Sequence, residues 1–208
     1  CALVLALVAV AAGQRALRRD PRAALSPGAL RPGDRINTRD NGPQEVMWTG
    51  HRRMTGARLY AMPHLRPVRF KAGALGIGRP DEDLLVSPQH RMLLKGGAAQ
   101  ALFNTPEVLV RAQDLINDTT VSVDYALREV TYVHILLERH NIVFANGIET
   151  ESFHPSNTAL EMVDAAQREG LLAILPEIAR NPETYGDYAR RNLSGKIGRA
   201  SCRERVSS

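Results

Sequence analysis

A hydroxyl and an imidazole lie three residues apart in the stretch DLLVSPQHRMLL, residues 83–94. The ordinary pKa of a histidine lies near neutrality, so His90 could both donate and accept a proton, with the Ser87 hydroxyl beside it. Such a pair suits reactions in which a departing amide nitrogen must be protonated. Pro88 fixes a turn after a strand that ends at Val86, which would aim both side chains into one pocket. A chance Ser-x-x-His on a half-buried strand would look the same when taken alone.

Two more histidines lie close together in the stretch TYVHILLERHN, residues 131–141. If this stretch is a regular strand, His134 and Glu138 face the same side of it. His134 would look identical whether it is a second acid–base group or a hydrogen-bonded core residue. His140 lies beside the expected turn, so we expect it to be exposed. A metal site built from His134, Glu138 and His140 is not expected, because strand residues six apart are about 20 Å from each other.

Composition and charge argue against several classes of function. The net charge of +5 comes mainly from scattered arginines with no aromatic residues between them, which favours a solvated basic surface over a nucleic-acid site. The two cysteines, Cys1 and Cys202, lie near opposite ends, so no disulfide framework or cysteine-based zinc site is expected. The apolar run at residues 2–12 is too short to span a bilayer. Glycine-rich phosphate loops, H-E-x-x-H and G-x-S-x-G are absent, and we predict no cofactor and no metal.

From Asp34 to Pro155 the chain consists of short strand-forming runs between turn signals. Asn41-Gly42, for example, is typical of a hairpin turn. Many short runs at this spacing predict an all-β barrel-like or sandwich fold, and not alternating strands and helices. The expected strands include RINT, PVRF, DLLV, RMLL, EVLV, VTYVHILL and IVFA, at residues 35–38, 67–70, 83–86, 91–94, 107–110, 130–137 and 142–145.

The texture of the sequence divides the chain into four parts. Residues 1–29 are interpreted as an apolar leader or a damaged, irregular entry, and residues 30–155 as the β domain. Residues 156–195 are predicted to form a helical extension, because apolar residues recur there near helical spacing. Residues 196–208 carry no apolar period and are expected to be a disordered, non-native tail.

Three stretches in this order resemble the Hint family, the self-processing domains shared by inteins and Hedgehog proteins. The likeness is greatest to bacterial Hint-like domains that end large secreted proteins. It implies a compact barrel or horseshoe of short antiparallel strands, in a secreted monomer that is covalently linked to an upstream polypeptide. It implies no cofactor and no nucleic-acid partner. The stretches are LRPGDRINTRDNG at 30–42, DLLVSPQHRMLL at 83–94 and TYVHILLERHNIVFANG at 131–147.

The resemblance also implies an activity and roles for residues. A Cys or Ser at the start of such a domain attacks the carbonyl before it, in an N–S or N–O acyl shift that cleaves the chain's own backbone in a single turnover. Ser87 and His90 match the family's Thr-x-x-His block, so His90 would protonate the scissile amide and Ser87 would orient it or contact the oxyanion. His134 matches a histidine that could assist acyl transfer. Asn146 and Gly147 are expected to form a turn near this site.

Two departures from the family pattern restrict the expected chemistry. Inteins carry a penultimate His and a final Asn where this chain has Glu151 and Ser152, so protein splicing is not expected. The family's nucleophile lies in a Cys-Phe…Gly-Thr pattern upstream of a Pro-Gly-Asp, but residues 11–30 contain no cysteine. Ser26 is too close to the Pro-Gly-Asp and Cys1 is too distant, so the nucleophile stays unassigned. We therefore predict an autoprocessing domain that is defective in this chain.

The residues leave a second function open. The β domain could be a non-catalytic structural or binding module of a larger secreted protein, with its helical extension docked on its own sheet or on a partner. The two functions differ at the candidate pocket. Only an autoprocessing domain has a reason to gather Ser87, His90 and the Asn146-Gly147 turn near the first strand.

Overall fold

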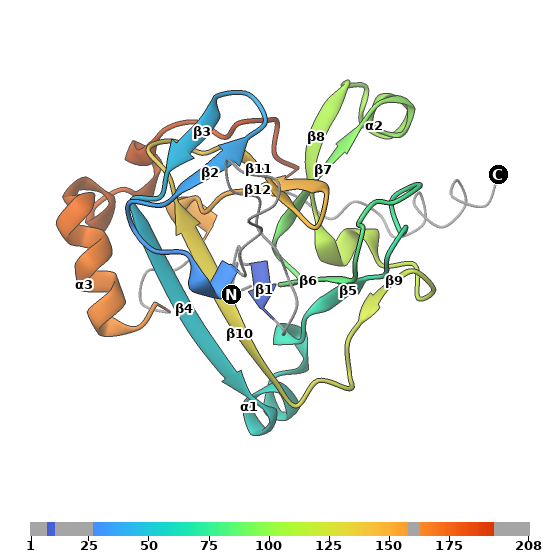
Figure 1. Ribbon diagram of the computed structural model, residues 1–208, viewed down its shortest axis with the longest axis horizontal. Helices are drawn as coiled ribbons and strands as arrows, with labels where there is room; N and C mark the ends of the chain where they lie inside the picture. The colour runs from blue at the N-terminus through green and yellow to red at the C-terminus, as the bar shows by residue number, and fades with distance from the viewer. Residues whose placement is uncertain (1–7, 11–26, 158–162, 194–208) are drawn as a thin grey trace.

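The computed structural model describes residues 8–10, 27–157 and 163–193. Within these ranges the chain forms two six-stranded antiparallel sheets and three short α-helices (Figure 1). This arrangement confirms the predicted all-β fold of short antiparallel strands. The expected tail at 196–208 lies outside the described residues, as does all of the expected entry at 1–29 except Val8–Val10 and Pro27–Ala29.

The strands pair in an order that differs from their order along the chain. The first sheet runs β4-β10-β1-β6-β5-β9 and the second runs β3-β2-β11-β12-β7-β8. The first sheet consists of β1 Val8–Val10, β4 Trp48–Thr55, β5 Val68–Phe70, β6 Leu84–Val86, β9 Val121–Val123 and β10 Glu129–Leu136. The second consists of β2 Arg35–Thr38, β3 Gly42–Glu45, β7 Arg91–Lys95, β8 Glu107–Arg111, β11 Ile142–Ala145 and β12 Ile148–Glu151.

The helices are short, and two of them occur inside the β domain, where the sequence had indicated none. Both lie in connections between strands, so they leave the sheets intact. No helix in the described ranges is long and apolar enough to cross a membrane. The α-helices are α1 Gly56–Ala61, α2 Gly97–Phe103 and α3 Ala165–Ile174; the 3-10 helices are η1 Pro27–Ala29, η2 Pro63–Leu65, η3 Ala112–Leu115, η4 Pro155–Asn157, η6 Pro176–Ala179 and η7 Pro182–Tyr185.

A shared core fixes the two sheets against each other near the candidate residues. Val86, at the end of β6, packs with Met92 of β7 and Ile148 of β12, and all three side chains are buried. Burial of each such side chain contributes roughly 1.5–3 kcal/mol. This cluster therefore holds the turn between β6 and β7 against β12.

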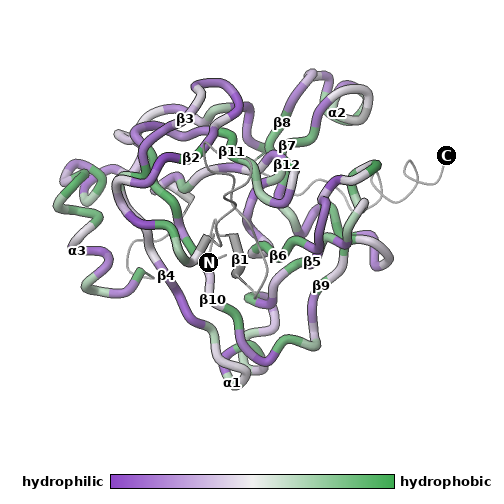
Figure 2. The backbone as a smooth tube through the Cα atoms, viewed as in Figure 1, coloured by the Kyte–Doolittle hydropathy of each residue, from purple (hydrophilic) through white to green (hydrophobic). Residues whose placement is uncertain are grey.

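The C-terminal extension packs on the β domain. α3 begins after Asp164, whose carboxylate accepts a hydrogen bond from a backbone N–H of the first turn, as an N-cap. The buried Leu171 of α3 belongs to a cluster with Trp48 of β4, and Figure 2 shows hydrophobic and hydrophilic stretches alternating along the helix. Beyond α3 the chain returns to β8, where Asn192 pairs with Leu109. In its described part, the extension is therefore helical at first and extended at its end.

Candidate active site

A turn between β6 and β7 carries Ser87 and His90. The backbone N–H of His90 donates to the carbonyl and hydroxyl oxygens of Ser87, at 3.1 and 3.2 Å. The carbonyl of Pro88 accepts from the backbone N–H of Gln113 at 3.0 Å, which ties the turn to η3. Both candidate side chains are buried. Local hydrogen bonds thus shape the turn, and a long-range one holds it in place.

The His90 imidazole is packed against β12. Its Nε2 is hydrogen-bonded to the hydroxyl of Thr150, which in turn donates to the carbonyl of Arg91 at 3.0 Å. Its Nδ1 is buried and has no hydrogen-bond partner among the described residues. Burial lowers the pKa of His90 to about 4, because the charged form loses its solvent. The ring is therefore neutral at neutral pH and keeps one ring nitrogen open.

Strand β1 runs between the two strands that lead to the candidate residues. Val8 pairs with Val133 of β10 on one side and with Val86 of β6 on the other, and Figure 1 shows β1 between these strands. In the chain, Val133 is followed by His134 and Val86 by Ser87. Neighbouring strands are about 4.8 Å apart. Ser87 follows β6 and His134 lies in β10, the two strands on either side of β1, so the two residues are roughly 10 Å from each other.

His134 lies in a buried aromatic cluster. Its ring centroid is 4.9 Å from that of Phe153, in an edge-to-face contact, and 6.2 Å from that of Trp48. Opposite His134 on β4 is Gly50, where a Cβ would come within 2.2 Å of the Trp48 ring. Glycine at this position therefore lets Trp48 cover the strand beside His134. The structure thus places His134 on the strand beside β1, with its ring packed among aromatic groups.

The turn Asn146-Gly147 joins β11 to β12. Both residues have positive φ, 46° and 75°, as a two-residue type I′ hairpin requires. Asn146 donates from Nδ2 to the carbonyl of Asp83 at 3.1 Å, and its carbonyl accepts from the N–H of Asp81 at 3.0 Å. Thr150 lies four residues further along the strand, about 13 Å away. The structure therefore brings this turn to the loop before β6.

Glu151 and Ser152, which replace the intein His and Asn, bond to the fold. The buried Glu151 carboxylate accepts from the backbone N–H of Arg91 at 2.9 Å and pairs with its guanidinium at 3.3 Å. Burial alone would raise the pKa of Glu151, but contact with His140 and the charge of Arg91 outweigh it and hold that pKa below its usual value. The Ser152 hydroxyl accepts from the N–H of Asn141 at 2.9 Å.

His140 was predicted to be exposed, and this prediction is wrong. The side chain is buried because the C-terminal segment covers it. Its Nδ1 accepts from the backbone N–H of Ala189 at 3.0 Å, and its Nε2 faces the Glu151 carboxylate at 3.5 Å. The covering residues come from far along the chain, so the local sequence around His140 contains no sign of them.

His154, for which the sequence predicted no role, is also buried under the C-terminal segment. Its Nε2 donates to the carbonyl of Gly186 at 2.8 Å, and its Nδ1 accepts from the N–H of Ser156 at 3.2 Å. Its ring stacks on that of Tyr188, with centroids 4.1 Å apart. Burial lowers the pKa of His154 to about 4. Both ring nitrogens are thus bonded to backbone groups, and the ring serves as an anchor for the C-terminal segment.

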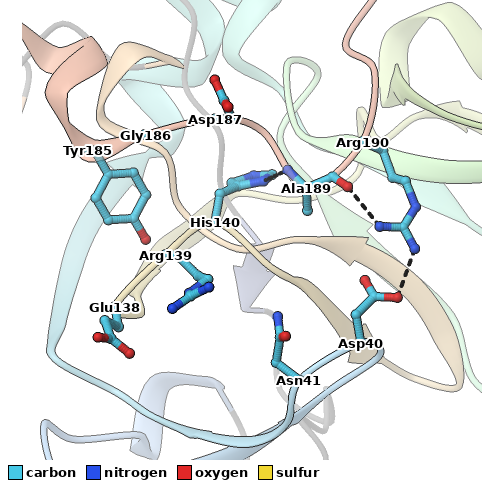
Figure 3. Close-up of a pocket in the computed structure, with 10 residues that line it drawn as sticks. All are labelled: Asp40, Asn41, Glu138, Arg139, His140, Tyr185, Gly186, Asp187, Ala189 and Arg190. Carbon is cyan, nitrogen blue, oxygen red and sulfur yellow. Dashed lines mark hydrogen bonds and ion pairs between the residues drawn. The ribbon is translucent and has the colours of Figure 1, made fainter.

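A pocket of about 490 Å³ opens beside this anchor (Figure 3). Arg190 crosses its edge and pairs with Asp40 at 2.8 Å. Acidic and basic side chains both line the pocket, and His90 is not among them. The lining residues are Asp40, Asn41, Glu138, Arg139, His140, Tyr185, Gly186, Asp187, Ala189 and Arg190.

Comparison with known proteins places the candidate residues inside a family match. Residues 21–157 match the profile of the Hint domain. A solved bacterial intein-like domain from Clostridium thermocellum is similar at 12% identity, over 71% of this chain and 98% of its own, with a TM-score of 0.46. No curated protein matches. Because the family match spans more than half of the chain and contains the Ser87–His90 turn, the chain belongs to the Hint domain family.

Proposed function

We propose that this Hint domain cleaves the peptide bond at its own N-terminal edge by an N–S or N–O acyl shift, and that this chain is defective because the family's nucleophile is not matched. The domain acts once, as a monomer, on a covalently linked upstream part of a secreted protein. The observation that carries the proposal is His90, a buried histidine with one ring nitrogen bonded and the other without a partner among the described residues, on the turn that follows β6, the strand that pairs with β1.

The reaction starts with a thiol or hydroxyl at the entry to β1. Its proton passes to Nδ1 of His90 while its sulfur or oxygen attacks the carbonyl carbon of the preceding residue. The protonated His90 then gives that proton to the departing amide nitrogen as the C–N bond breaks. The products are a thioester or ester and a free amino group. A second nucleophile takes the acyl group and restores the first.

The electrostatics of His90 support this order of proton transfers. With a pKa of about 4, the ring is unprotonated before the reaction and can accept a proton. Once protonated in a buried place, it is a strong acid toward the amide nitrogen. Ser87 holds the turn through the His90 N–H and offers its hydroxyl to the reacting carbonyl. His134, on the other side of β1, assists the transfer of the acyl group.

The structural roles of Glu151 and Ser152 favour cleavage at the N-terminal edge alone. Both side chains are bonded to the fold, and neither supplies the imidazole or the carboxamide that cleavage at a C-terminal junction needs. The chain then continues into Phe153 and His154, which are buried in the core. A cut after Ser152 would detach residues that the fold uses.

The test is an intact-mass measurement on two fusions of this chain behind an N-terminal reporter. One fusion carries the chain as it stands. The other carries Leu7→Cys, which puts a cysteine directly before Val8, the residue that pairs with both Val86 and Val133. Each is incubated with and without a strong thiol, beside a His90→Ala version.

We expect the first fusion to stay intact and the Leu7→Cys fusion to release the reporter, with thiol accelerating release. His90→Ala should slow release by about 10²–10⁴-fold, the usual contribution of general acid–base catalysis. Release that is unaffected by His90→Ala would contradict the role given to His90. A folded Leu7→Cys fusion that is never cut would favour a non-catalytic structural or binding module.

A further inference from the structure

We propose that Thr150 is a positioning residue that selects the tautomer of His90 and so makes Nδ1 the proton acceptor of the cleavage reaction. The inference deepens the proposed function and rests on it. Thr150 lies sixty residues from His90 in the chain, on the neighbouring strand β12. Its hydroxyl is hydrogen-bonded to Nε2 of the His90 ring.

The hydrogen bonds of the Thr150 hydroxyl determine where the imidazole proton lies. A hydroxyl has one proton to donate and two lone pairs that accept. The carbonyl of Arg91, 3.0 Å from Thr150 Oγ1, can only accept, and the Met92 sulfur at 3.7 Å is a second, weaker acceptor. The hydroxyl proton therefore points to this side and not to the imidazole. The bond between Thr150 and Nε2 of His90 is then donated by Nε2–H. A neutral imidazole carries one proton, which leaves Nδ1 with a free lone pair.

The reverse tautomer would be unfavourable in this environment. A proton on Nδ1 would be a buried donor with no acceptor among the described residues, and an unsatisfied buried donor costs about 1–3 kcal/mol. A bare Nδ1 lone pair remains available to a thiol or hydroxyl proton. The tautomer with its proton on Nε2 therefore leaves Nδ1 ready to accept a proton.

The position of Thr150 is well fixed. Its side chain is fully buried, and its backbone pairs with Met92 of β7. A β-branched side chain has few accessible rotamers on a strand. Next along β12, Glu151 holds the backbone N–H of Arg91 at 2.9 Å. Thr150 and Glu151 of β12 thus bond to His90 and to Arg91, respectively.

The first experiment measures the tautomer directly and requires no cleavage. Long-range ¹H–¹⁵N spectra of this chain at neutral pH should show His90 with a protonated Nε2 and an unprotonated Nδ1. Thr150→Val keeps the shape and removes the hydroxyl, so the population with a protonated Nδ1 should rise. Thr150→Ser should restore the original pattern. Thr38→Val is the matched control, because Thr38 is also a buried strand residue whose hydroxyl donates to a carbonyl, that of Gly42 at 2.7 Å.

The second experiment follows reporter release from the Leu7→Cys fusion. Thr150→Val should slow release by roughly 10- to 100-fold, as loss of a group that orients a functional histidine does, and Thr150→Ser should recover most of the rate. Thr38→Val should not change it. The pH at which release is half-maximal should also move in Thr150→Val, which a purely structural defect would not cause.

The outcomes separate the two proposals. An unchanged His90 tautomer in Thr150→Val overturns the role of Thr150, whatever happens to cleavage. A shifted tautomer with slower release supports it. If His90→Ala leaves release unchanged, the proposed function fails while the tautomer measurement still decides the effect of Thr150 on the ring. If His90→Ala abolishes release but Thr150→Val does not slow it, the function stands and the positioning role is wrong.

Discussion

Two buried histidine sites in this molecule differ in how completely their rings are bonded. His90 and His154 are both buried, and burial lowers the pKa of each to about 4. At His154 both ring nitrogens bond to backbone groups, those of Gly186 and Ser156. At His90 one nitrogen meets the Thr150 hydroxyl and the other is open among the described residues. Burial and pKa are therefore similar at His154, which anchors the C-terminal segment, and at His90, the candidate catalytic group. The two sites differ in whether both ring nitrogens are hydrogen-bonded.

The difference has a structural origin. The His154 site is closed by the C-terminal segment, which supplies a carbonyl and stacks Tyr188 on the ring. The C-terminal segment makes no hydrogen bond to the His90 ring among the described residues, and the ring lies on the turn that follows β6. Glu151 lies between the two sites. It contacts Arg91, next to His90, and it also contacts His140, whose ring centroid is 5.4 Å from that of His154.

The largest effect is expected from the residue that joins the two sites. Glu151→Gln keeps the shape but leaves the buried Arg91 guanidinium without its counter-charge. Breaking a buried ion pair from one side typically costs about 3–5 kcal/mol of unfolding free energy. Urea denaturation of Glu151→Gln measures this loss. The control is Glu129→Gln, which breaks the exposed pair with Arg53 and should leave the free energy of unfolding close to that of the unchanged chain. Equal losses in the two variants would contradict the structural role of Glu151.

Acid should weaken the fold through both histidines. The folded pKa of His90 and of His154 is about 4, below the ordinary 6.5, so the unfolded chain takes up protons first as the pH falls. Their contribution is complete above pH 6.5 and is lost between pH 6.5 and about 4. At pH 5 His90 alone should cost about 2 kcal/mol, and His154 should add to that loss. Urea denaturation at pH 7.5 and 5 measures the change, and His154→Gln should reduce its slope. A stability that does not fall over this range would show that the rings are not held neutral.

Alanine at the two histidines should separate stability from activity. His154→Ala leaves a backbone carbonyl and an N–H unpaired and removes the stack on Tyr188, so we expect a loss of roughly 2–3 kcal/mol. His90→Ala leaves the Thr150 hydroxyl bonded to its carbonyl and should cost about 1 kcal/mol. Thermal denaturation compares the two variants. In the Leu7→Cys fusion the order should reverse, with His90→Ala the more damaging to reporter release. The same order in both assays would remove the distinction between anchor and active site.

The smallest effect is expected at a hydrogen bond that holds the C-terminal segment on the β domain. The hydroxyl of Tyr185 donates to the carbonyl of Leu137 at 2.8 Å in a buried place. Tyr185→Phe should therefore cost about 1 kcal/mol by leaving that carbonyl unpaired. Tyr60→Phe is the control, since Tyr60 is 82% exposed and should show no change in melting temperature. A Tyr185→Phe variant as stable as its control would mean that the segment is held by other contacts.

Local sequence was sufficient for the parts of the molecule that depend on local physics. Alternating apolar residues and Asn-Gly turns predicted the short strands and the hairpins, because strand pairing and turn geometry are set within a few residues. The Ser87–His90 turn is of the same kind, since its hydrogen bonds close within one turn. The family resemblance rested on these same stretches, and the family match over residues 21–157 contains them.

Tertiary structure alone decided what each of these groups touches. Thr150 meets His90 across sixty positions of sequence, and the Ala189 N–H reaches His140 across forty-nine. No spacing in the chain specifies such contacts, because they arise from sheet order and from the path of the C-terminal segment. For the same reason His140 is buried where its own surroundings indicated exposure, and the Asn146-Gly147 turn reaches the loop before β6. The sequence by itself determined which groups the protein carries, and the packing of distant strands decided which of them remain open to chemistry.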